Sequence, residues 1–409
     1  MYYSKEMKRV NARRTLAMLG PAFVAAVAYV DPGNFAANFS AGAQYGYLLL
    51  WVLVVANVMA MLVQYLSAKV GLVTGKSVPE VVAEKLGRKS RLAYWLQAEL
   101  VAIACDIAEV VGGALALNLL FDVPLLLGGI ITGVVSMLLL VIYNSPEKKY
   151  FERVIVGLMM IIPIGFVVGL FNHPPDMSQA AAGLVPRFDG AETVLLAAAM
   201  LGATIMPHVV YLHSALARDR HGRVSTDKIR TYLRATKIDV GVAMVLAGGV
   251  NISMLLLAAS ALADFEHIET FHDIHAALGQ GTGTLVATLF GVGLLVSGLT
   301  STSVASQAGS VIMQGLLGRS FNVFFRRSIT LVPALLILAI GYDPTSALIV
   351  SQIGLSFGVP FALIPLAMIT ASRRIMGDQV NQRAVTVLIY AIAGVVSLLN
   401  LALIWLTFF

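Results

Sequence analysis

The feature that most constrains this chain is a series of eleven hydrophobic stretches that recur along its whole length. A helix needs about 20 residues to cross a bilayer, and most of the stretches reach that length. They cover residues 16–43, 46–72, 92–120, 123–143, 153–171, 191–216, 237–262, 283–315, 328–341, 345–371 and 385–408. Apolar residues make up 58% of the sequence and charged residues only 12%, too few to keep such a chain dissolved in water. The sequence therefore predicts an all-α polytopic membrane protein.

The basic residues predict how the chain is oriented. Every one of the 28 Lys and Arg residues except Arg187 lies at the N-terminus or near alternate connections between spans. The connection 263–282 carries acidic residues and no Lys or Arg. Because basic residues gather in cytoplasmic loops, we expect a cytoplasmic N-terminus, and the odd number of spans places the C-terminus outside. Helical spans indicate a plasma membrane or bacterial inner membrane. This topology explains the net charge of +6 without a nucleic-acid partner.

The sequence excludes several other classes of protein. Cys105 is the only cysteine, which excludes an intramolecular disulfide and a metal site built from cysteines. No GxxxxGK[ST] motif for nucleotide phosphates is present, so we do not expect ATP to drive the protein. No cluster of catalytic side chains is apparent. We therefore expect neither an enzyme nor a resident cofactor.

Two stretches carry helix-breaking residues deep in an apolar run. The first reads Ala28-Tyr29-Val30-Asp31-Pro32-Gly33-Asn34, and the sixth reads Gly202-Ala203-Thr204-Ile205-Met206-Pro207-His208. Proline removes a backbone donor and glycine loosens the chain, so both helices should be discontinuous. Unwound backbone is tolerated at membrane depth only where it is buried in protein or lines a cavity. Packing kinks are the alternative, but a matching pair flanked by polar or sulfur groups favours a binding site.

The spacing of the two breaks predicts an internal repeat. The first break lies in span one and the second in span six, so residues 16–171 and 191–371 would form two five-helix repeats. Because five is odd, the two repeats have opposite orientations in the membrane. We expect a cytoplasmic segment 1–15 before them, an external loop 172–190 between them, and an added loop and eleventh helix at 372–409. Paired broken helices at matching places indicate a transporter site at the bilayer midplane.

The residues at the breaks suggest what binds there. Asp31 and Asn34 offer oxygen ligands, which suit a cation, and Met206 would add a thioether that favours transition metals over calcium and magnesium. Two alternatives stay open. The protein could transport an organic solute such as an amino acid, with Asp31 binding its amine. It could also be a passive metal channel.

The two motifs also resemble those of a known family. Asp31-Pro32-Gly33-Asn34 and Met206-Pro207-His208, with Gly20-Pro21-Ala22-Phe23 and Tyr211-Leu212-His213-Ser214 around them, are similar to the signatures of the Nramp divalent-metal transporters, most closely the bacterial proton-dependent manganese transporters. The resemblance implies a LeuT-type 5+5 fold and the import of manganese, and also iron, with protons by alternating access. We expect the protein to be a monomer. It implies metal ligands from the side chains of Asp31, Asn34 and Met206, the carbonyls of Ala28 and Ala203, and Gln352 in some states.

Three carboxylates lie on one face of the third span. At 100° per residue, Glu99, Asp106 and Glu109 fall within a narrow arc. Such a stripe could be a proton relay, or a structural salt-bridge network with Arg326 or Arg327. The residues alone leave the two readings open. The resemblance implies a proton pathway through Asp106, Glu109 and Arg327, with Arg326 as the adjacent candidate.

Two histidines follow the second break. His208 lies two residues after Met206, and His213 five residues further on. Histidine titrates near neutral pH, so both are candidates for proton coupling, although a histidine in a span is more often a packing residue. His267, His272 and His275 lie in the acidic outer connection, where they could collect metal or simply be solvated.

Overall fold

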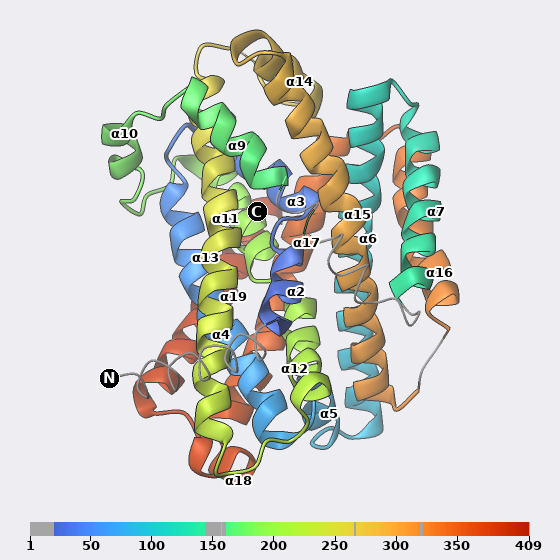
Figure 1. The fold of residues 1–409 in the computed structure, drawn as a ribbon, viewed down its shortest axis with the longest axis vertical. Coiled ribbons are helices and arrows are strands. Elements are labelled where there is room, and N and C mark those ends of the chain that lie inside the picture. Colours follow the sequence, from blue (N-terminus) through green and yellow to red (C-terminus); the bar gives the residue numbers. More distant parts are fainter. Residues whose placement is uncertain (1–19, 144–156, 158–160, 266, 320–321, 409) are drawn as a thin grey trace, which may run out of the picture.

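The computed structural model describes residues 20–143, 157, 161–265, 267–319 and 322–408. Every regular element in this part of the chain is a helix, and the long helices run side by side in one bundle (Figure 1). The all-α prediction is confirmed. The predicted cytoplasmic segment 1–15 lies outside the described residues, as does the start of the fifth predicted span.

Eight helical segments of the described chain are long and apolar enough to cross a membrane. Each coincides with one of the predicted stretches. They are α4 (Leu50–Thr74), α6 (Arg88–Phe121), α7 (Leu125–Tyr143), α11 and α12 together (Gly190–Thr204 and Pro207–His221), α13 (Ile229–Ala261), α15 (Thr284–Leu317), α17 (Pro344–Thr370) and α19 (Arg383–Phe408).

The three remaining stretches form shorter helices. The first is split into α2 (Pro21–Ala28) and α3 (Pro32–Tyr45). The fifth is described from α9 (Ile161–Asn172) onward, and the ninth is α16 (Val323–Ala339), a helix of 17 residues. Short helices that the hydropathy pattern did not predict join the spans: α5 (Val78–Ala83), α10 (Met177–Ala182), α14 (Phe271–Gly281) and α18 (Arg373–Met376), the last followed by the 3-10 turn η1 (Gly377–Gln379).

Several helices extend beyond the predicted stretches at the basic end of the bundle. The seventh stretch was expected to begin at residue 237, but α13 begins at Ile229 and includes Arg230 and Arg234. The third was expected to begin at 92, but α6 begins at Arg88. Hydropathy marks the part of a helix that lies in hydrocarbon, whereas the backbone hydrogen bonds continue into the polar region.

Both predicted breaks are present, and they are arranged as a pair. In each broken span, the second half-helix begins with proline at its first position, where no amide donor is needed. α3 contacts α11 and α2 contacts α12, so the two halves of one broken span lie against the two halves of the other (Figure 1). The breaks therefore meet inside the bundle, where residues 25–42 and 196–215 are almost entirely buried.

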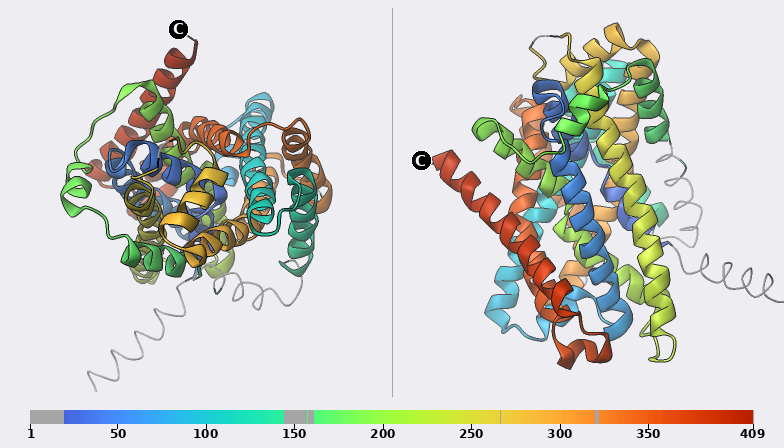
Figure 2. Two further views of the ribbon diagram at one scale, coloured as in Figure 1. Left: turned by 90° about the horizontal axis from the view of Figure 1, so that it is seen from above. Right: turned by 90° about the vertical axis from the view of Figure 1, so that its left-hand side faces the viewer.

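The last helix is set apart from the rest. Figure 2 shows α19 leaning away from the bundle toward its C-terminal end. It contacts α17, α11 and α4 on one side and is largely exposed on the other. This position agrees with its prediction as an addition outside the two repeats.

Candidate metal-binding site

Asp31 begins the second half of the first broken span. Its backbone is extended, and its Oδ1 accepts hydrogen bonds from the Asn34 backbone amide at 2.7 Å and from Asn34 Nδ2 at 2.8 Å. This is the usual N-cap arrangement, which satisfies an amide that has no partner within the helix. The side chain is fully buried, and its Oδ2 has no hydrogen-bond partner among the described residues.

Asn34 ties the two breaks together. Its Nδ2 donates to Asp31 Oδ1 and also, at 3.1 Å, to the carbonyl oxygen of Ala203 in α11. With both donors used, its Oδ1 is left buried and has no partner in the described structure. The carbonyl of Ala203, one of the ligands that the resemblance implies, therefore lies beside the Asp31–Asn34 pair.

Met206 stands at the break of the sixth span. α11 ends at Thr204, where the Ile205 amide makes the last bond to the Leu201 carbonyl at 2.7 Å. Met206 is the N-cap of α12, with extended backbone angles (φ −72°, ψ 114°), and it is fully buried. Along the chain, Met206 follows Ala203 by three residues, and the carbonyl of Ala203 is the one that Asn34 contacts.

Gln352 reaches the same region from α17. A Cβ atom at Gly33 would lie 1.8 Å from Gln352 Nε2, and one at Gly202 would lie 2.2 Å from the Gln352 backbone oxygen. Only glycine fits this closely at both positions, so α17 packs directly on both breaks. Gln352 Nε2 donates to Ser351 Oγ at 3.2 Å, and Gln352 Oε1 is buried without a partner among the described residues.

The unwound segment of the first span offers few free carbonyls. The carbonyl of Tyr29 accepts from Asn251 Nδ2 at 2.8 Å, and that of Val30 accepts from Ser297 Oγ at 2.6 Å. These bonds anchor the segment to α13 and α15. The carbonyl of Ala28, just before them, remains the candidate ligand that the resemblance implied.

The site as a whole is rich in acceptors that lack donors. Asp31 Oδ2, Asn34 Oδ1 and Gln352 Oε1 are all buried and unpartnered in the described chain. A buried acceptor left unpaired costs about 1–3 kcal/mol, and a cation bound among these oxygens would offset that cost. The described residues contain no group of three or more His, Cys, Asp or Glu side chains placed to hold a metal. A cation at the breaks would therefore depend on amide, carbonyl and thioether ligands around one carboxylate.

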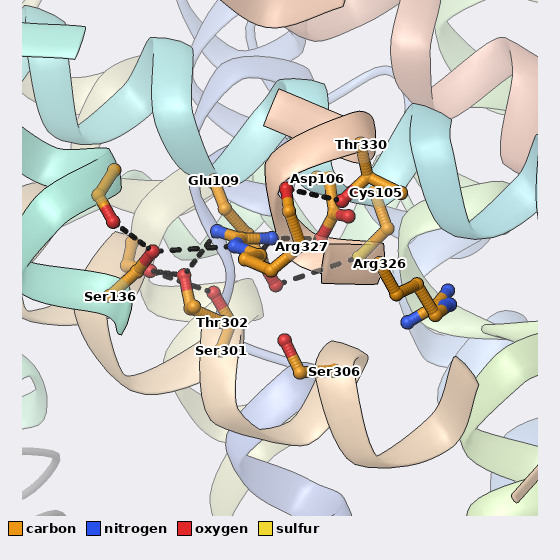
Figure 3. Close-up of polar contacts among 12 residues, drawn as sticks. Cys105, Asp106, Glu109, Ser136, Ser301, Thr302, Ser306, Arg326, Arg327 and Thr330 are labelled. Carbon is orange, nitrogen blue, oxygen red and sulfur yellow. Dashed lines mark hydrogen bonds and ion pairs between the residues drawn. The ribbon is translucent and has the colours of Figure 1, made fainter. Parts of the chain in front are cut away.

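Arg327 of α16 lies at the centre of a buried charged network (Figure 3). Its guanidinium forms an ion pair with Asp106 and a longer one, at 3.5 Å, with Glu109, both on α6. It also contacts Ser136 Oγ at 3.3 Å and Thr302 Oγ1 at 3.4 Å. Only 1% of the side chain is exposed, so each of its contacts replaces water.

Arg326 belongs to a separate pair. Its Nε donates to Glu99 Oε1 at 2.8 Å, and its guanidinium lies against Gly309 of α15. Consecutive residues on a helix point about 100° apart, which explains why Arg326 and Arg327 pair with different carboxylates. The structure thus contains ion pairs between these carboxylates and both arginines, and proton movement along them remains a proposal.

His208 is linked to this network through a residue that sequence reasoning did not select. Its Nε2 lies 3.6 Å from Cys105 Sγ, which lies 3.7 Å from Glu109 Oε1. Cys105 precedes Glu109 by four residues, so the two share a helix face. That spacing was the available signal. The chain His208–Cys105–Glu109 joins the break of the sixth span to the Arg327 network.

His213 has a different partner. Its Nδ1 lies 2.8 Å from Gln64 Oε1, and Gln64 Nε2 donates to the Tyr29 hydroxyl at 2.6 Å. The described contacts thus connect His213 to the break of the first span, and the carboxylates of α6 are not among its partners. Sequence reasoning missed Gln64, Asn251 and Ser297, although a polar residue within an apolar span was a signal for each.

The histidines of the outer connection have separate partners. His272 Nε2 lies 2.6 Å from Asn118 Oδ1, and the ring of His275 lies 6.5 Å from that of Phe290. His267 is exposed in the loop before α14. No metal-holding group is found among these described side chains.

Two discontinuous helices that meet at a buried polar centre are the arrangement found in the LeuT-type fold. The solved structure of Mhp1, described as a nucleobase-cation-symport-1 family transporter in a closed conformation, matches at a TM-score of 0.57 and 16% identity. It covers 87% of this chain and 79% of that one, and shows the shared fold. The family described as "Natural resistance-associated macrophage protein-like" matches residues 22–406. The chain belongs to this Nramp family of membrane transporters.

Two relatives cover almost the whole chain. The divalent metal cation transporter MntH of Mycobacterium tuberculosis (strain ATCC 25618 / H37Rv) is 56% identical over 404 residues, which span 98% of this chain and 94% of that protein. The crystal structure of the Eremococcus coleocola manganese transporter in complex with an aromatic bis-isothiourea substituted compound is 30% identical, with a TM-score of 0.82. That match covers 95% of this chain and 86% of the other. The family prediction is confirmed.

Proposed function

We propose that this protein imports divalent transition metals, chiefly manganese and also iron, together with protons. The observation that carries this proposal is the set of three buried, unpartnered oxygens at the breaks of the two discontinuous helices. The names of the relatives, divalent metal cation transporter and manganese transporter, support the same substrate class.

The proposed ligands contribute differently to metal selectivity. Asp31 supplies the negative charge, and Asn34, Gln352 and the carbonyls of Ala28 and Ala203 supply neutral oxygens. Oxygen ligands alone would bind calcium and magnesium as readily as manganese and iron. The Met206 thioether is a softer ligand, so it should favour manganese and iron over calcium and magnesium. Its effect is therefore expected on selectivity more than on binding as such.

The proposed proton route uses the charged network beside the site. Its members are Asp106, Glu109, Arg327 and His208, with Arg326, Glu99 and His213 as further candidates. Cys105 joins His208 to Glu109 at hydrogen-bonding distance, which supports a connection between the metal site and the carboxylates. Coupling would follow if a proton on this network and a metal at Asp31 influence one another's affinity.

The proposed setting follows from the charge pattern. The basic end of the bundle would face the cytoplasm of a plasma or bacterial inner membrane, with the C-terminus outside. The two repeats would alternate access to a fixed midplane site, and each monomer would carry one such site. We propose the same arrangement of the remaining parts as the sequence predicts. Residues 1–15 would be cytoplasmic, residues 172–190 an external loop, and residues 372–409 a loop followed by the eleventh helix.

The test is manganese uptake into proteoliposomes that contain a metal-sensitive dye, with excess calcium outside and at two external pH values. We expect saturable uptake that resists calcium and rises at acid pH. Asp31→Asn should abolish it, and Met206→Ala should keep uptake but lose its resistance to calcium. Met200→Ala is the matched control, because Met200 is also fully buried but lies within α11, away from the break.

The same experiment separates the alternatives. Uptake that never saturates would indicate a passive channel. No uptake in correctly oriented protein would overturn the proposal and leave an organic solute as the next substrate to test. Normal uptake in Asp31→Asn would remove the proposed site even if transport itself were real.

A further inference from the structure

The lower half of the sixth span, α12, is fastened along its length to α4 and α5. Ser67 Oγ of α4 donates to the Val210 carbonyl at 2.5 Å, and the Val78 amide of α5 donates to Ser214 Oγ at 2.9 Å. Gly71 lies so close that a Cβ there would be 2.2 Å from the Ser214 carbonyl oxygen. Figure 1 shows α5 beside the lower end of α12.

An ion pair completes this attachment at the end of α12. Glu80 of α5 pairs with Arg218, which lies in the last turn of α12. The same carboxylate accepts hydrogen bonds from the Ser77 amide at 2.6 Å and the Ser77 hydroxyl at 2.8 Å, forming the capping box of α5. Glu80 is thereby held in place before it meets Arg218, so little side-chain entropy is lost in forming the pair.

The helix that carries Glu80 is itself braced from behind. A Cβ atom at Gly315 of α15 would lie 2.6 Å from Pro79 Cβ. Beneath the ion pair, a small apolar cluster separate from the main core joins α4, α12 and α13. It consists of Ala68, Leu72, Ala217, Ile229 and Leu233. Moving α12 away from α4 and α5 together would break the ion pair and expose the part of this cluster that α4 contributes, Ala68 and Leu72.

The opposite end of the bundle carries a larger cavity. A cavity of about 710 Å³ lies at the upper end of α3, α11 and α17, the three helices that carry Asn34, Ala203 and Gln352. Its lining includes Tyr45, Glu192 and Thr345. α12 is therefore closely packed on α4 and α5 at one end, where a smaller cavity of about 280 Å³ lies beside Glu80, and the larger cavity lies at the other end. In a transporter that alternates access, the packed end is the closed gate.

We propose that Glu80 and Arg218 are a positioning pair that latches α12 against α5 and so sets how often the cytoplasmic gate opens. This inference rests on the alternating access proposed above. The latch acts on the half-helix that begins at Met206, so its release would connect the metal site to the cytoplasm.

A neighbouring ion pair provides a matched control. Lys76 and Glu84 lie just before and just after α5 and pair with each other, and both side chains are about half exposed. Exposed pairs of this kind contribute little. Glu84→Gln therefore removes the same charge from the same helix without affecting the latch.

The test is the rate at which a thiol reagent labels a cysteine at position 68. Ala68 is fully buried in the cluster beneath the ion pair, and Ala68→Cys is a small change. Cys105, the only native cysteine, is buried in the core, so labelling of the parent measures the background. The readout requires no transport, so it stays interpretable even if manganese uptake were absent.

We expect Glu80→Gln to raise the labelling rate on the order of fivefold, because glutamine keeps the cap of α5 but loses the charge. Arg218→Gln should do the same, and the double variant should add nothing further, since the two residues share one interaction. Arg218→Lys should restore most of the protection. Glu84→Gln should leave the rate unchanged.

Three results would overturn the latch. The first is an equal rise in Glu84→Gln, which would make the effect one of net charge. The second is additive effects of Glu80→Gln and Arg218→Gln. The third is protection that persists in both single variants while each remains folded, shown by an unchanged Tm.

Discussion

At the scale of single residues, close contacts around two glycines decide whether the site can form. Gly33 faces the end of the Gln352 side chain, whereas Gly202 faces the Gln352 backbone. A side chain can move aside but a packed helix backbone cannot, so the two positions should respond differently to the same substitution.

Gly33→Ala should therefore be rescued by a second change, and Gly202→Ala should not. Each single variant is expected to lose about 1–3 kcal/mol from overpacking. Adding Gln352→Ala should recover stability in Gly33→Ala, because the clashing atoms are removed, but not in Gly202→Ala. The measurement is Tm in detergent, with Gly249→Ala of α13 as the control, since its Cβ would meet nothing within 4 Å. Equal rescue of both variants would contradict the account.

The buried guanidinium of Arg327 supports a second prediction at this scale. Arg327→Gln leaves Asp106 and Glu109 buried without their shared cation, so it should cost about 3–5 kcal/mol. Asp106→Asn in the same chain should recover part of that loss. Unfolding measured for Arg327→Gln, the double variant and the exposed control Arg319→Gln checks this. An Arg327→Gln variant as stable as the control would show that the network is not structural.

At the scale of elements, the sequence predicted the two broken helices but not what holds them. Proline and glycine within an apolar run identified the breaks, because both act locally on the backbone. The partners of Tyr29 and Val30 are Asn251 and Ser297, which lie more than 200 residues away on other helices. Which of two adjacent arginines meets which carboxylate likewise depended on the rotation of α16. Contacts between distant residues and the rotation of a helix leave no local pattern in the sequence from which they could be predicted.

The α5 element gives a prediction about pH. Partial burial raises the pKa of Glu80, but the Ser77 hydrogen bonds and Arg218 lower it more, so the net pKa is below its ordinary 4.5. Because the pKa of Glu80 is lower in the folded protein than in the unfolded chain, its ionised form stabilises the fold above pH 4.5. This stabilisation is lost as the pH falls through the pKa of the folded state. The charged groups around it are Lys76, Glu84, Arg91, Arg218 and Asp219.

The difference in Tm between the parent and Glu80→Gln should therefore stay constant from pH 7 to pH 5 and narrow only below about pH 4.5. The moderately acid pH at which we expect uptake to rise would therefore leave the latch closed. Glu84→Gln should show no comparable difference at any pH. A difference that disappears between pH 7 and pH 5 would mean that another group titrates in the latch.

At the scale of the whole molecule, the bundle has a basic end, as the distribution of charge along the sequence predicts, and an end with a large cavity. The extended ends of α6 and α13, with their basic residues, lie at the same end as α5, and the cavity lined by Glu192 lies at the other. Hydropathy and charge could predict this polarity because the bilayer acts on every span alike. The short helices α10 and α14 were not predicted, because they lie in connections where hydropathy carries little signal.

Topology is tested with impermeant labels on intact cells. Arg187→Cys should be labelled from outside, and Lys89→Cys should be labelled only after the membrane is opened. Both side chains are exposed, so neither result depends on burial. Labelling of Lys89→Cys in sealed cells would invert the proposed orientation.

The central claim is that a divalent metal binds between the two breaks, and calorimetric titration of manganese into the purified protein tests it most directly. In excess calcium, the account predicts one saturable manganese site per chain, no binding in Asp31→Asn, and binding in Met206→Ala that calcium now displaces. Met200→Ala should bind as the parent does. Unchanged manganese binding in Asp31→Asn would contradict the account and place the metal elsewhere in the molecule.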